Sequence, residues 1–548
     1  MLSYRKLAMC VLGRPLHTGG GIDLPRPASQ RAAAFILTAA MLTTLAAPAF
    51  AGTWYIEDGD ITVKAGETEG TNKVSQGANQ EVEDTDTIIK NREDTASSNT
   101  VTIDAGSDKV EVTLQDVNIK ADSGSALTSN GDLTLPLKGE NHLTGGNGDT
   151  YGGDGITSRG SLTISGGTVT ATGGNSTDSV GSGGSGIYSV SGDVTISGGS
   201  TVTANGGSGT ISGGSGIYSV SGDVTISGGT VTANGGSGKD GYGGYGISSS
   251  DVAISGGTVN ANGGDSKDGY GGNGISSSSG VAISGGTVTA NGGSGNSSGG
   301  NGIRSFDVAI SGGTVKAAGG NGKNGNGGNG IIGSGRVAIS GGTVNAAGGD
   351  GGNGKDGGYG IISNDIDLSG SLELTAKAGS PNGKALSQKG SELVLDTIKD
   401  KLGPGAKVTV TDANGKVNQV SIPRPVEPEE PVIPGESSSS SDGGSAAPSA
   451  PASPLPGLTV TDKDGQRISY TSTQSGNTLT VCVGRLTASF RISLAALRQL
   501  RAEGIETITF QTILCSTTLS VDELLAMGGE DAEAVLTHRF TDSSLTVG

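Results

Sequence analysis

Residues 244–264 read GYGISSSDVAISGGTVNANGG, and this stretch decides the fold. It opens with a Gly-Ile step at Ile247 and continues with two short runs in which apolar and polar residues alternate. Val252 and Ile254 are the apolar positions of the first run, and Val259 is the first apolar position of the second. Alternation with a period of two predicts β-strands that bury one side. The Gly-Gly step between the two runs predicts a turn with positive φ, so one unit contains three short strands.

This unit is repeated along the middle of the chain. The ISGG anchor begins at Ile164, Ile196, Ile226, Ile254, Ile283, Ile310 and Ile339. The Gly-Ile anchor recurs at Ile156, Ile187, Ile217, Ile247, Ile275, Ile303, Ile331 and Ile361. A unit of about 28–30 residues without a helix cannot bury its apolar side alone, whereas stacked copies bury it against one another. The sequence therefore predicts an all-β fold, a right-handed parallel β-helix. A β-propeller is the alternative, although its repeats are longer and carry four strands.

Glycine supplies 103 of the 548 residues, well above the average usage of about 7%. The chain has no strict G-X-Y period and only 16 prolines, which excludes collagen. We expect the glycines to lie at the corners and in the loops of the stacked coils. Their excess is then explained as turn chemistry, repeated once in every coil.

Composition divides the chain into six segments. These are a signal peptide (residues 1–51), irregular N-terminal coils (52–145), regular β-helix repeats (146–365), C-terminal coils that form a cap (366–422), a Pro/Ser-rich linker (423–457) and a small α+β module (458–548). The signal peptide is predicted from an apolar run at residues 32–45, followed by the cleavage motif Ala49-Phe50-Ala51. We therefore expect a secreted, extracellular protein, with association with the cell surface left open. After cleavage no further apolar run of membrane length remains, so no transmembrane segment is expected.

In the C-terminal module aliphatic and charged residues return. Residues 493–503 predict a helix that begins at a serine cap and ends at Gly504. Strands are predicted at residues 479–483 and 506–513, and a second short helix at residues 520–527. The two cysteines of the module, Cys482 and Cys515, form a disulfide or remain two buried thiols, and the sequence leaves both open.

The net charge of −18 disfavours nucleic acid as a partner, because an acidic surface repels phosphates. No nucleophile motif, Cys/His pair or zinc spacing is present, and the repeat strands carry almost no carboxylates. Arg304 and Arg336 are interpreted as solvated surface arginines. We therefore expect a protein that is not an enzyme and that is a monomer.

Calcium is the candidate ion. Residues 235–243 (GGSGKDGYG) match the nonapeptide GGxGxDxUx when Tyr242 counts as the apolar position, and partial matches surround two further aspartates. The candidate ligands are Asp240, Asp268 and Asp356. Turn carbonyls and a carboxylate together offer the oxygen ligands that calcium prefers. However, one match per coil is fewer than a tandem calcium roll needs, and flexible polar loops are the alternative interpretation.

Sugar binding favours exposed aromatic rings, which stack on the C–H faces of a pyranose. The candidate carbohydrate-binding residues are Tyr151, Tyr188, Tyr218, Tyr242, Tyr270 and Tyr359. We expect Tyr151, Tyr242, Tyr270 and Tyr359 to gather along one loop edge; tyrosines that simply cover the glycine loops are the alternative. Threonine columns of the kind that bind ice are a weaker alternative, because Asn260, Lys316 and Asn345 interrupt them.

The motifs GDGI (residues 153–156) and LTISGGTVTATGG (162–174), with their later copies, resemble a known family. These are the exported "carbohydrate-binding domain-containing" β-helix proteins of anaerobic Gram-positive bacteria. Residues 112–146 (VTLQDVNIKADSGSALTSNGDLTLPLKGENHLTGG) look like the first coils of that family, and the resemblance covers roughly residues 55–375. It implies a right-handed parallel β-helix that binds plant cell-wall polysaccharide without catalysis, including cellulose and acidic pectic chains, with structural calcium.

The leading hypothesis is therefore non-catalytic binding of an extracellular polysaccharide, assisted by calcium. The first alternative is a structural stalk or surface adhesin without glycan specificity, with function residing in the C-terminal module. A polysaccharide lyase is a further alternative, although the acidic calcium cluster and basic residue that such an enzyme needs are not evident in the repeats.

Overall fold

The computed structural model describes two stretches of the chain. They are residues 51–423 and residues 457–547, the latter with gaps at 463–465, 469, 476, 484, 486, 513–515, 528–531 and 539–542. The first stretch forms a solenoid and the second forms the C-terminal module. The predicted signal peptide, except its last residue, and nearly all of the predicted linker lie outside the described residues.

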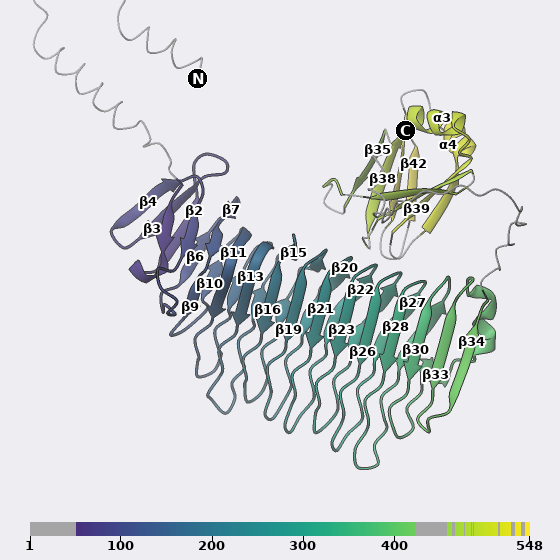
Figure 1. The fold of residues 1–548 in the computed structure, drawn as a ribbon, viewed down its shortest axis with the longest axis horizontal. Helices are drawn as coiled ribbons and strands as arrows, with labels where there is room; N and C mark the ends of the chain where they lie inside the picture. The colour runs from purple at the N-terminus through teal and green to yellow at the C-terminus, as the bar shows by residue number, and fades with distance from the viewer. Residues whose placement is uncertain are drawn as a thin grey trace, which may run out of the picture. The chain divides into compact units, whose positions relative to one another are not determined.

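The solenoid consists of about 13 coils of roughly 29 residues, which confirms the predicted parallel β-helix. Figure 1 shows the coils stacked side by side, with long loops projecting along one edge. Each regular coil contributes strands to three faces. We call these the Gly-Ile face, the ISGG face and the Thr face, after the sequence that opens each strand.

The Gly-Ile face holds the strands that follow each glycine-rich loop. Its members are β10 (Leu127–Ser129), β12 (Ile156–Ser158), β14 (Ile187–Ser189), β17 (Ile217–Ser219), β24 (Ile303–Ser305) and β31 (Leu386–Gln388), with the first parts of β20 (Ile247–Ile254), β22 (Ile275–Ile283), β27 (Ile331–Ile339) and β29 (Ile361–Leu368). The isoleucines pair in register, for example Ile187 with Ile217, and both are fully buried. A serine such as Ser189 also points inward, and its hydroxyl donates to the carbonyl of Gly192 at 2.7 Å, so that the buried polar group is satisfied.

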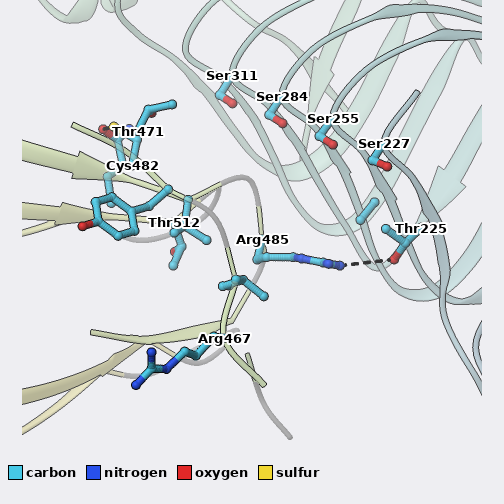
Figure 2. Close-up of a pocket in the computed structure, with 15 residues that line it drawn as sticks. Thr225, Ser227, Ser255, Ser284, Ser311, Arg467, Thr471, Cys482, Arg485 and Thr512 are labelled. Carbon is cyan, nitrogen blue, oxygen red and sulfur yellow. Dashed lines mark hydrogen bonds between the residues drawn. The ribbon is translucent and has the colours of Figure 1, made fainter. Parts of the chain in front are cut away.

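The ISGG face follows in each coil. It contains the first parts of β11 (Asp132–Thr144) and β13 (Leu162–Thr172), then β15 (Val194–Ser197), β18 (Val224–Ile226) and β25 (Asp307–Ile310), and the second parts of β20, β22, β27 and β29. Val194 pairs with Val224 and Ile196 with Ile226, and all four side chains are fully buried. Figure 2 shows a matching outer row in which Ser227 and the serines at 255, 284 and 311 lie on four successive coils.

The Thr face closes the coil. It holds the second parts of β11 and β13, then β16 (Thr201–Asn205), β19 (Thr230–Asn234), β21 (Thr258–Asn262), β23 (Thr287–Asn291), β26 (Thr314–Ala318), β28 (Thr343–Ala347), β30 (Glu373–Lys377) and β33 (Lys407–Thr411). Val202 and Ala204 are fully buried, and the alternate residues face outward.

The N-terminal end of the solenoid is less regular. Its strands are β1 (Thr53–Tyr55), β2 (Ile61–Ala65), β3 (Asn72–Gln76), β4 (Asn79–Asp84), β5 (Ile88–Lys90), β6 (Val101–Asp104), β7 (Lys109–Glu111), β8 (Thr113–Gln115) and β9 (Asn118–Lys120), with the short helix η1 (Ile56–Asp58). β2, β3 and β4 pair antiparallel, in contrast to the parallel coils. Ion pairs lie on this hairpin, for example between Lys64 Nζ and Glu81 Oε1, which are 3.0 Å apart. A charged antiparallel hairpin ends the stack and discourages further strand addition.

The C-terminal end of the solenoid is closed in a similar way. The helix η2 (Leu395–Lys401) packs beside the last coils, and β32 (Ser391–Glu392) and β34 (Val417–Ser421) pair antiparallel with β31 and β33. Leu395 and Ile398 of η2 are buried in the core of the solenoid.

The C-terminal module has a core of its own. One sheet contains β35 (Leu458–Thr461), β38 (Ala488–Ser493), β41 (Glu533–His538) and β42 (Ser543–Val547). The other contains β36 (Thr471–Ser475), β37 (Thr478–Cys482), β39 (Thr507–Gln511) and β40 (Ser516–Ser520). The predicted helices are confirmed as α3 (Leu494–Ala502), which Ser493 caps by accepting from the Ala496 N–H at 3.2 Å, and α4 (Val521–Met527). The arrangement in two four-stranded sheets was not predicted.

The glycine-rich loops are held together by a chain of backbone hydrogen bonds at their base, which we call the glycine neck. The outgoing arm of each loop and its returning arm donate to one another alternately. Gly214 N donates to Gly207 O at 2.8 Å, Gly236 N to Gly214 O at 2.7 Å, and Gly244 N to Gly236 O at 2.8 Å. The same pattern continues from coil to coil, so the neck is a second ladder beside the three strand faces.

Glycine is required in the neck because the two backbones approach too closely for a side chain. A Cβ added at Gly236 would lie closer than 3.0 Å to the carbonyl oxygen of Gly207, and one added at Gly244 would meet Gly214 O in the same way. Positive φ is instead found at the ISGG turns, for example +77° at Gly257, where it was predicted. The explanation of the whole glycine excess as turn chemistry is therefore wrong for the neck. Close backbone packing excludes every other residue there.

A substitution tests this explanation. Gly236→Ala is expected to destabilise the solenoid by about 1–3 kcal/mol, because the added methyl group must displace a neighbouring backbone. Gly228→Ala is the matched control: no atom lies within 4 Å of a Cβ built at Gly228, and its φ is not in the left-handed region. Urea unfolding followed by circular dichroism measures both, and an equal effect of the two substitutions would contradict the role of the neck.

His538 is a buried titratable group of the module. It is fully buried, its Nε2 lies 2.9 Å from the Thr517 hydroxyl, and its ring contacts Phe490 edge-on with centroids 5.6 Å apart. Its Nδ1 has no hydrogen-bond partner among the described residues. Burial lowers the pKa of His538, because the charged imidazolium loses its water.

The lowered pKa predicts a stability that depends on pH. The unfolded imidazole titrates near pH 6.5, so the module is expected to keep full stability above about that pH and to lose it as the pH falls further. The protection factors of the β38 and β41 amides in the full chain, which are corrected for the slower intrinsic exchange at lower pH, should therefore fall between about pH 7 and pH 5. His538→Gln, which stays neutral, should remove this dependence; an unchanged dependence would refute the assignment to His538.

Candidate functional site

Outward-facing residues of successive coils stand above one another in columns, since the coils pair in register. The strand column runs along the Gly-Ile face and contains Thr128, Thr157, Tyr188, Tyr218, Ser248, Ser276, Arg304, Ile332 and Ile362. Tyr188 and Tyr218 are therefore neighbours, with ring centroids 5.6 Å apart and ring planes tilted by 45°.

A groove of about 410 Å³ lies on this face, beginning at the second of these tyrosines. It is lined by Tyr218, Ser219, Val220, Tyr245, Ser248, Ser249, Ser276, Ser277, Ser278, Arg304, Ser305, Phe306 and Ser334. Aromatic rings from Tyr218 and Tyr245 stand at one end and Phe306 at the other, with serine side chains between them. Phe306 is 52% exposed, which is unusual for a phenylalanine.

The groove contains one cation. Arg304 follows Ser276 in the strand column, and it has no ion-pair partner among the described residues. Arg336, in contrast, forms ion pairs with Asp365, at 3.5 Å, and Asp367. The sequence predicted that Arg304 and Arg336 are both solvated surface arginines. The structure distinguishes them, because aspartates neutralise Arg336, whereas Arg304 faces the groove.

A carboxylate lies at the N-terminal side of the two strand-column tyrosines. Asp154 accepts from the Ser185 N–H and from the Thr157 hydroxyl, each at 2.7 Å. Burial raises the pKa of Asp154 above its usual range, although both hydrogen bonds oppose the shift. Burial also raises the pKa of the Tyr188 phenol, with smaller contributions from Tyr218 and Asp154. The Tyr188 phenol therefore stays neutral and can donate a hydrogen bond.

The loop tyrosines form a different column. Tyr151, Ser182, Ser212, Tyr242, Tyr270, Ser298 and Asn326 pair in register along the returning arms of the loops. Tyr242 and Tyr270 stack with ring centroids 5.3 Å apart and an angle of 17° between the planes. Tyr359 was expected to join this edge, but it lies elsewhere. The Gly330 N–H donates to the Tyr359 carbonyl just as the Gly216 N–H donates to that of Tyr245, so Tyr359 shares the column of Tyr245.

The three candidate calcium ligands lie exposed in the loops. Asp240 and Asp268 occupy neighbouring coils, while Asp356 accepts from the Asn382 side chain at 3.0 Å. In the part of the chain that the structure describes, no group of three or more His, Cys, Asp or Glu residues could hold a metal ion. Other acidic and amide side chains of the loops, such as Asp265, cap a backbone N–H of the next coil, in this case Ser294 at 2.7 Å.

Of the two cysteines, only Cys482 lies within the described residues. It is a half-buried residue of β37 whose Sγ donates to the Gln511 side chain at 3.5 Å, and Figure 2 shows it beside Thr471 of the paired strand. Burial raises the pKa of the Cys482 thiol. The predicted disulfide stays a prediction, because Cys515 lies outside the described residues.

The threonines of the Thr face form two columns. Asn260, Lys316 and Asn345 interrupt one of them, as expected. The neighbouring column is continuous and contains Thr168, Thr201, Thr230, Thr258, Thr287, Thr314 and Thr343. It is a regular row of hydroxyls on a face other than the one that holds the groove.

Sequence reasoning found Tyr188 and Tyr218 but missed Tyr245 and Phe306 as members of the same site. Tyr245 precedes Ile247 of the Gly-Ile anchor by two residues, and Phe306 follows the corresponding strand two coils later. Aligning every residue around the Gly-Ile anchor, rather than the anchors alone, would have placed both beside the strand column.

The comparisons with known proteins agree with this architecture. A family model described as "Beta helix repeat" matches the chain at residues 162–186, 224–251, 252–279 and 281–302. These matches fall in the regular coils and cover less than half of the chain. With the three-faced solenoid, they define the chain as a parallel β-helix repeat protein. No curated protein and no solved structure matches the chain.

The described helices were also compared with the length and hydropathy that a membrane-spanning helix needs. Within the described ranges, no helix is both long and apolar enough to cross a bilayer.

Proposed function

We propose that the solenoid binds an extracellular polysaccharide in the groove of the Gly-Ile face, without catalysis. The observation that carries this proposal is the composition of the groove: Tyr218, Tyr245 and Phe306 surround a floor of serines. A sugar ring presents apolar C–H faces and polar edges. Aromatic rings stack on the faces, while serine and tyrosine hydroxyls donate to and accept from the edges.

The direction of the groove supports a chain-like ligand. Tyr218 and Arg304 lie three coils apart in the strand column. Adjacent coils are separated by about 4.8 Å, so these side chains span roughly 14 Å along the solenoid. A polymer that lies parallel to the solenoid axis contacts several coils at once, which suits a linear polysaccharide better than a single sugar.

The same composition favours binding over hydrolysis. Glycoside hydrolysis uses two carboxyl groups that flank the scissile bond, about 5–10 Å apart. The lining of the groove includes neither aspartate nor glutamate. We therefore propose a binding protein rather than an enzyme, exported by the predicted signal peptide and acting outside the cell.

Plant cell-wall glycans are the proposed ligands, with cellulose as the neutral case and pectic chains as the acidic case. The aromatic rings of the groove can stack on the sugar rings of either glycan. Arg304 distinguishes them, since an arginine without a carboxylate partner can bind a uronate bidentately.

A structural stalk or surface adhesin is the second candidate. The length of the stack, about 13 coils, favours it, because a solenoid of this kind holds a module away from its point of attachment. This function needs no groove, and the two candidates are therefore separable by mutating it.

The groove variants give the central prediction. Tyr218→Ala and Phe306→Ala are each expected to weaken binding to cellulose and to polygalacturonate about tenfold, about 1.4 kcal/mol, by removing a stacking surface. Arg304→Ala should weaken binding to polygalacturonate only. Depletion of the soluble chain by the insoluble glycan, over a series of glycan concentrations, measures these constants.

Tyr359→Ala is the matched control, because Tyr359 shares the column of Tyr245 but lies four coils beyond it and outside the groove. It should bind like the unmodified chain. If the unmodified chain is retained by neither glycan, the binding function fails and the stalk remains.

Calcium assistance is proposed at the loop edge, outside the groove. There an ion bound by the exposed Asp240 and Asp268 of neighbouring loops bridges them to an acidic glycan that extends beyond the groove. Retention on polygalacturonate should then increase with calcium and fall after chelation, whereas retention on cellulose should not change. Asp240→Asn combined with Asp268→Asn should remove the calcium effect. An equal effect of calcium on the double variant would contradict this bridge.

A further inference from the structure

A row of exposed rings on the loop edge lies apart from the groove. We call it the loop column and take its first six members: Tyr151, Ser182, Ser212, Tyr242, Tyr270 and Ser298. They occupy six successive coils. Side chains at one register position of a parallel ladder point the same way, so the six form a single row.

The three tyrosines of this row are unusually exposed. Tyr151 is 75% exposed, Tyr242 56% and Tyr270 48%. Aromatic residues held out from a polar surface mark interaction sites. The serines between them are small, so the row alternates between projecting rings and recesses that are one or two coils wide.

The order of rings and recesses is self-complementary. From the N-terminal coil onward it is Tyr, Ser, Ser, Tyr, Tyr, Ser, and the reversed order places a serine opposite every tyrosine. We propose that the loop column is the interface of a homodimer, in which a second copy of this chain lies antiparallel along the loop edge. The two-fold axis passes between the coils of Ser212 and Tyr242. An isologous contact of this kind is closed and cannot extend into a filament.

Each ring of one copy then fills a recess of the other. Tyr242 faces Ser212 of the second copy, Tyr270 faces Ser182, and Tyr151 faces Ser298. A tyrosine that packs into such a recess buries its ring, and its hydroxyl can bond the serine hydroxyl opposite. The tyrosine pair Tyr242–Tyr270, already stacked, is preorganised to enter the two-coil recess.

The charges of the loops are compatible with this pairing. The loop that carries Asp149 faces residues 291–302, and the loop that carries Lys239 and Asp240 faces residues 205–216; both opposing loops are uncharged. Asp178 faces the loop that contains Lys267 together with Asp265 and Asp268, so this contact alone brings a carboxylate opposite a loop with a net negative charge.

The area is sufficient for a weak dimer. Six largely exposed tyrosines and the recesses they enter bury roughly 1,000 Å², the lower end for a specific interface. We therefore expect dissociation constants in the micromolar range rather than an obligate dimer. The expectation of a monomer, made from the sequence, took no account of this edge.

The test uses the mature full chain in sedimentation equilibrium, from low micromolar to near-millimolar concentration. The mass should rise from that of one chain to that of two. Ser212→Tyr places a ring opposite Tyr242 of the second copy and should weaken association at least tenfold. Tyrosine occupies this register position in three coils already, so the loop tolerates it. The double variant Ser212→Tyr with Tyr242→Ser restores the order of one ring opposite each recess and should recover association.

Thr258→Tyr on the Thr face is the matched control and should leave the mass unchanged, because Thr258 is exposed and lies outside both the loop column and the groove. Circular dichroism confirms that each variant is folded. A chain that remains monomeric throughout overturns the proposal, as does a double variant that associates no better than Ser212→Tyr. A monomeric chain in which Tyr242→Ser lowers retention on glycan would assign the loop column to sugar binding instead. Because the groove is untouched by these variants, failure of the dimer does not decide the proposed function.

Discussion

The close approach of two backbones at the glycine neck is the constraint on which the solenoid depends. Successive arms donate hydrogen bonds alternately, such as Gly236 N to Gly214 O, and leave no room for a side chain. The loops therefore cannot spread, and they stack as regularly as the strands. Asparagine side chains reinforce this order beside the neck, because Asn234 donates to Asn205 at 2.9 Å and Asn262 to Asn234 at 2.8 Å. A polar ladder of this kind satisfies its own donors along the axis.

Regular stacking gives each outward position a functional meaning. Equivalent positions of successive coils lie about 4.8 Å apart along the solenoid axis. A substitution in one coil therefore changes one side chain in a row that runs along the surface. Tyr218 and Arg304 thus lie at opposite ends of one groove although 86 positions separate them in the sequence. The inward positions vary little, since Val or Ile is needed in every coil. The outward positions carry the variation from which a ligand site or an interface is built.

The fold was predictable because its signals are local and repeated. Alternating Val252 and Ile254, and the turn glycine Gly257, predict strand, turn and strand without knowledge of any distant residue. The candidate site was predictable only in part. Tyr188 and Tyr218 were found because they precede identical serines, whereas Tyr359 was assigned to the wrong edge. Loop lengths differ between coils, and a loop of one more residue shifts every position counted from its start.

The sequence by itself determined the coil: its length, its inward isoleucines and valines, and its glycine-rich loops. The tertiary structure decided why the glycines are there and which outward residues meet. The periodicity of the sequence predicts on which side of its strand a side chain lies. It does not predict how closely two loop arms approach one another, or whether an arginine lies next to a carboxylate. Arg336 is neutralised by Asp365 and Asp367 of the next coil, and Arg304 faces a groove, although the sequence predicts a solvated surface residue at both positions. Packing between coils made that distinction, because the partners lie about 30 residues away along the chain.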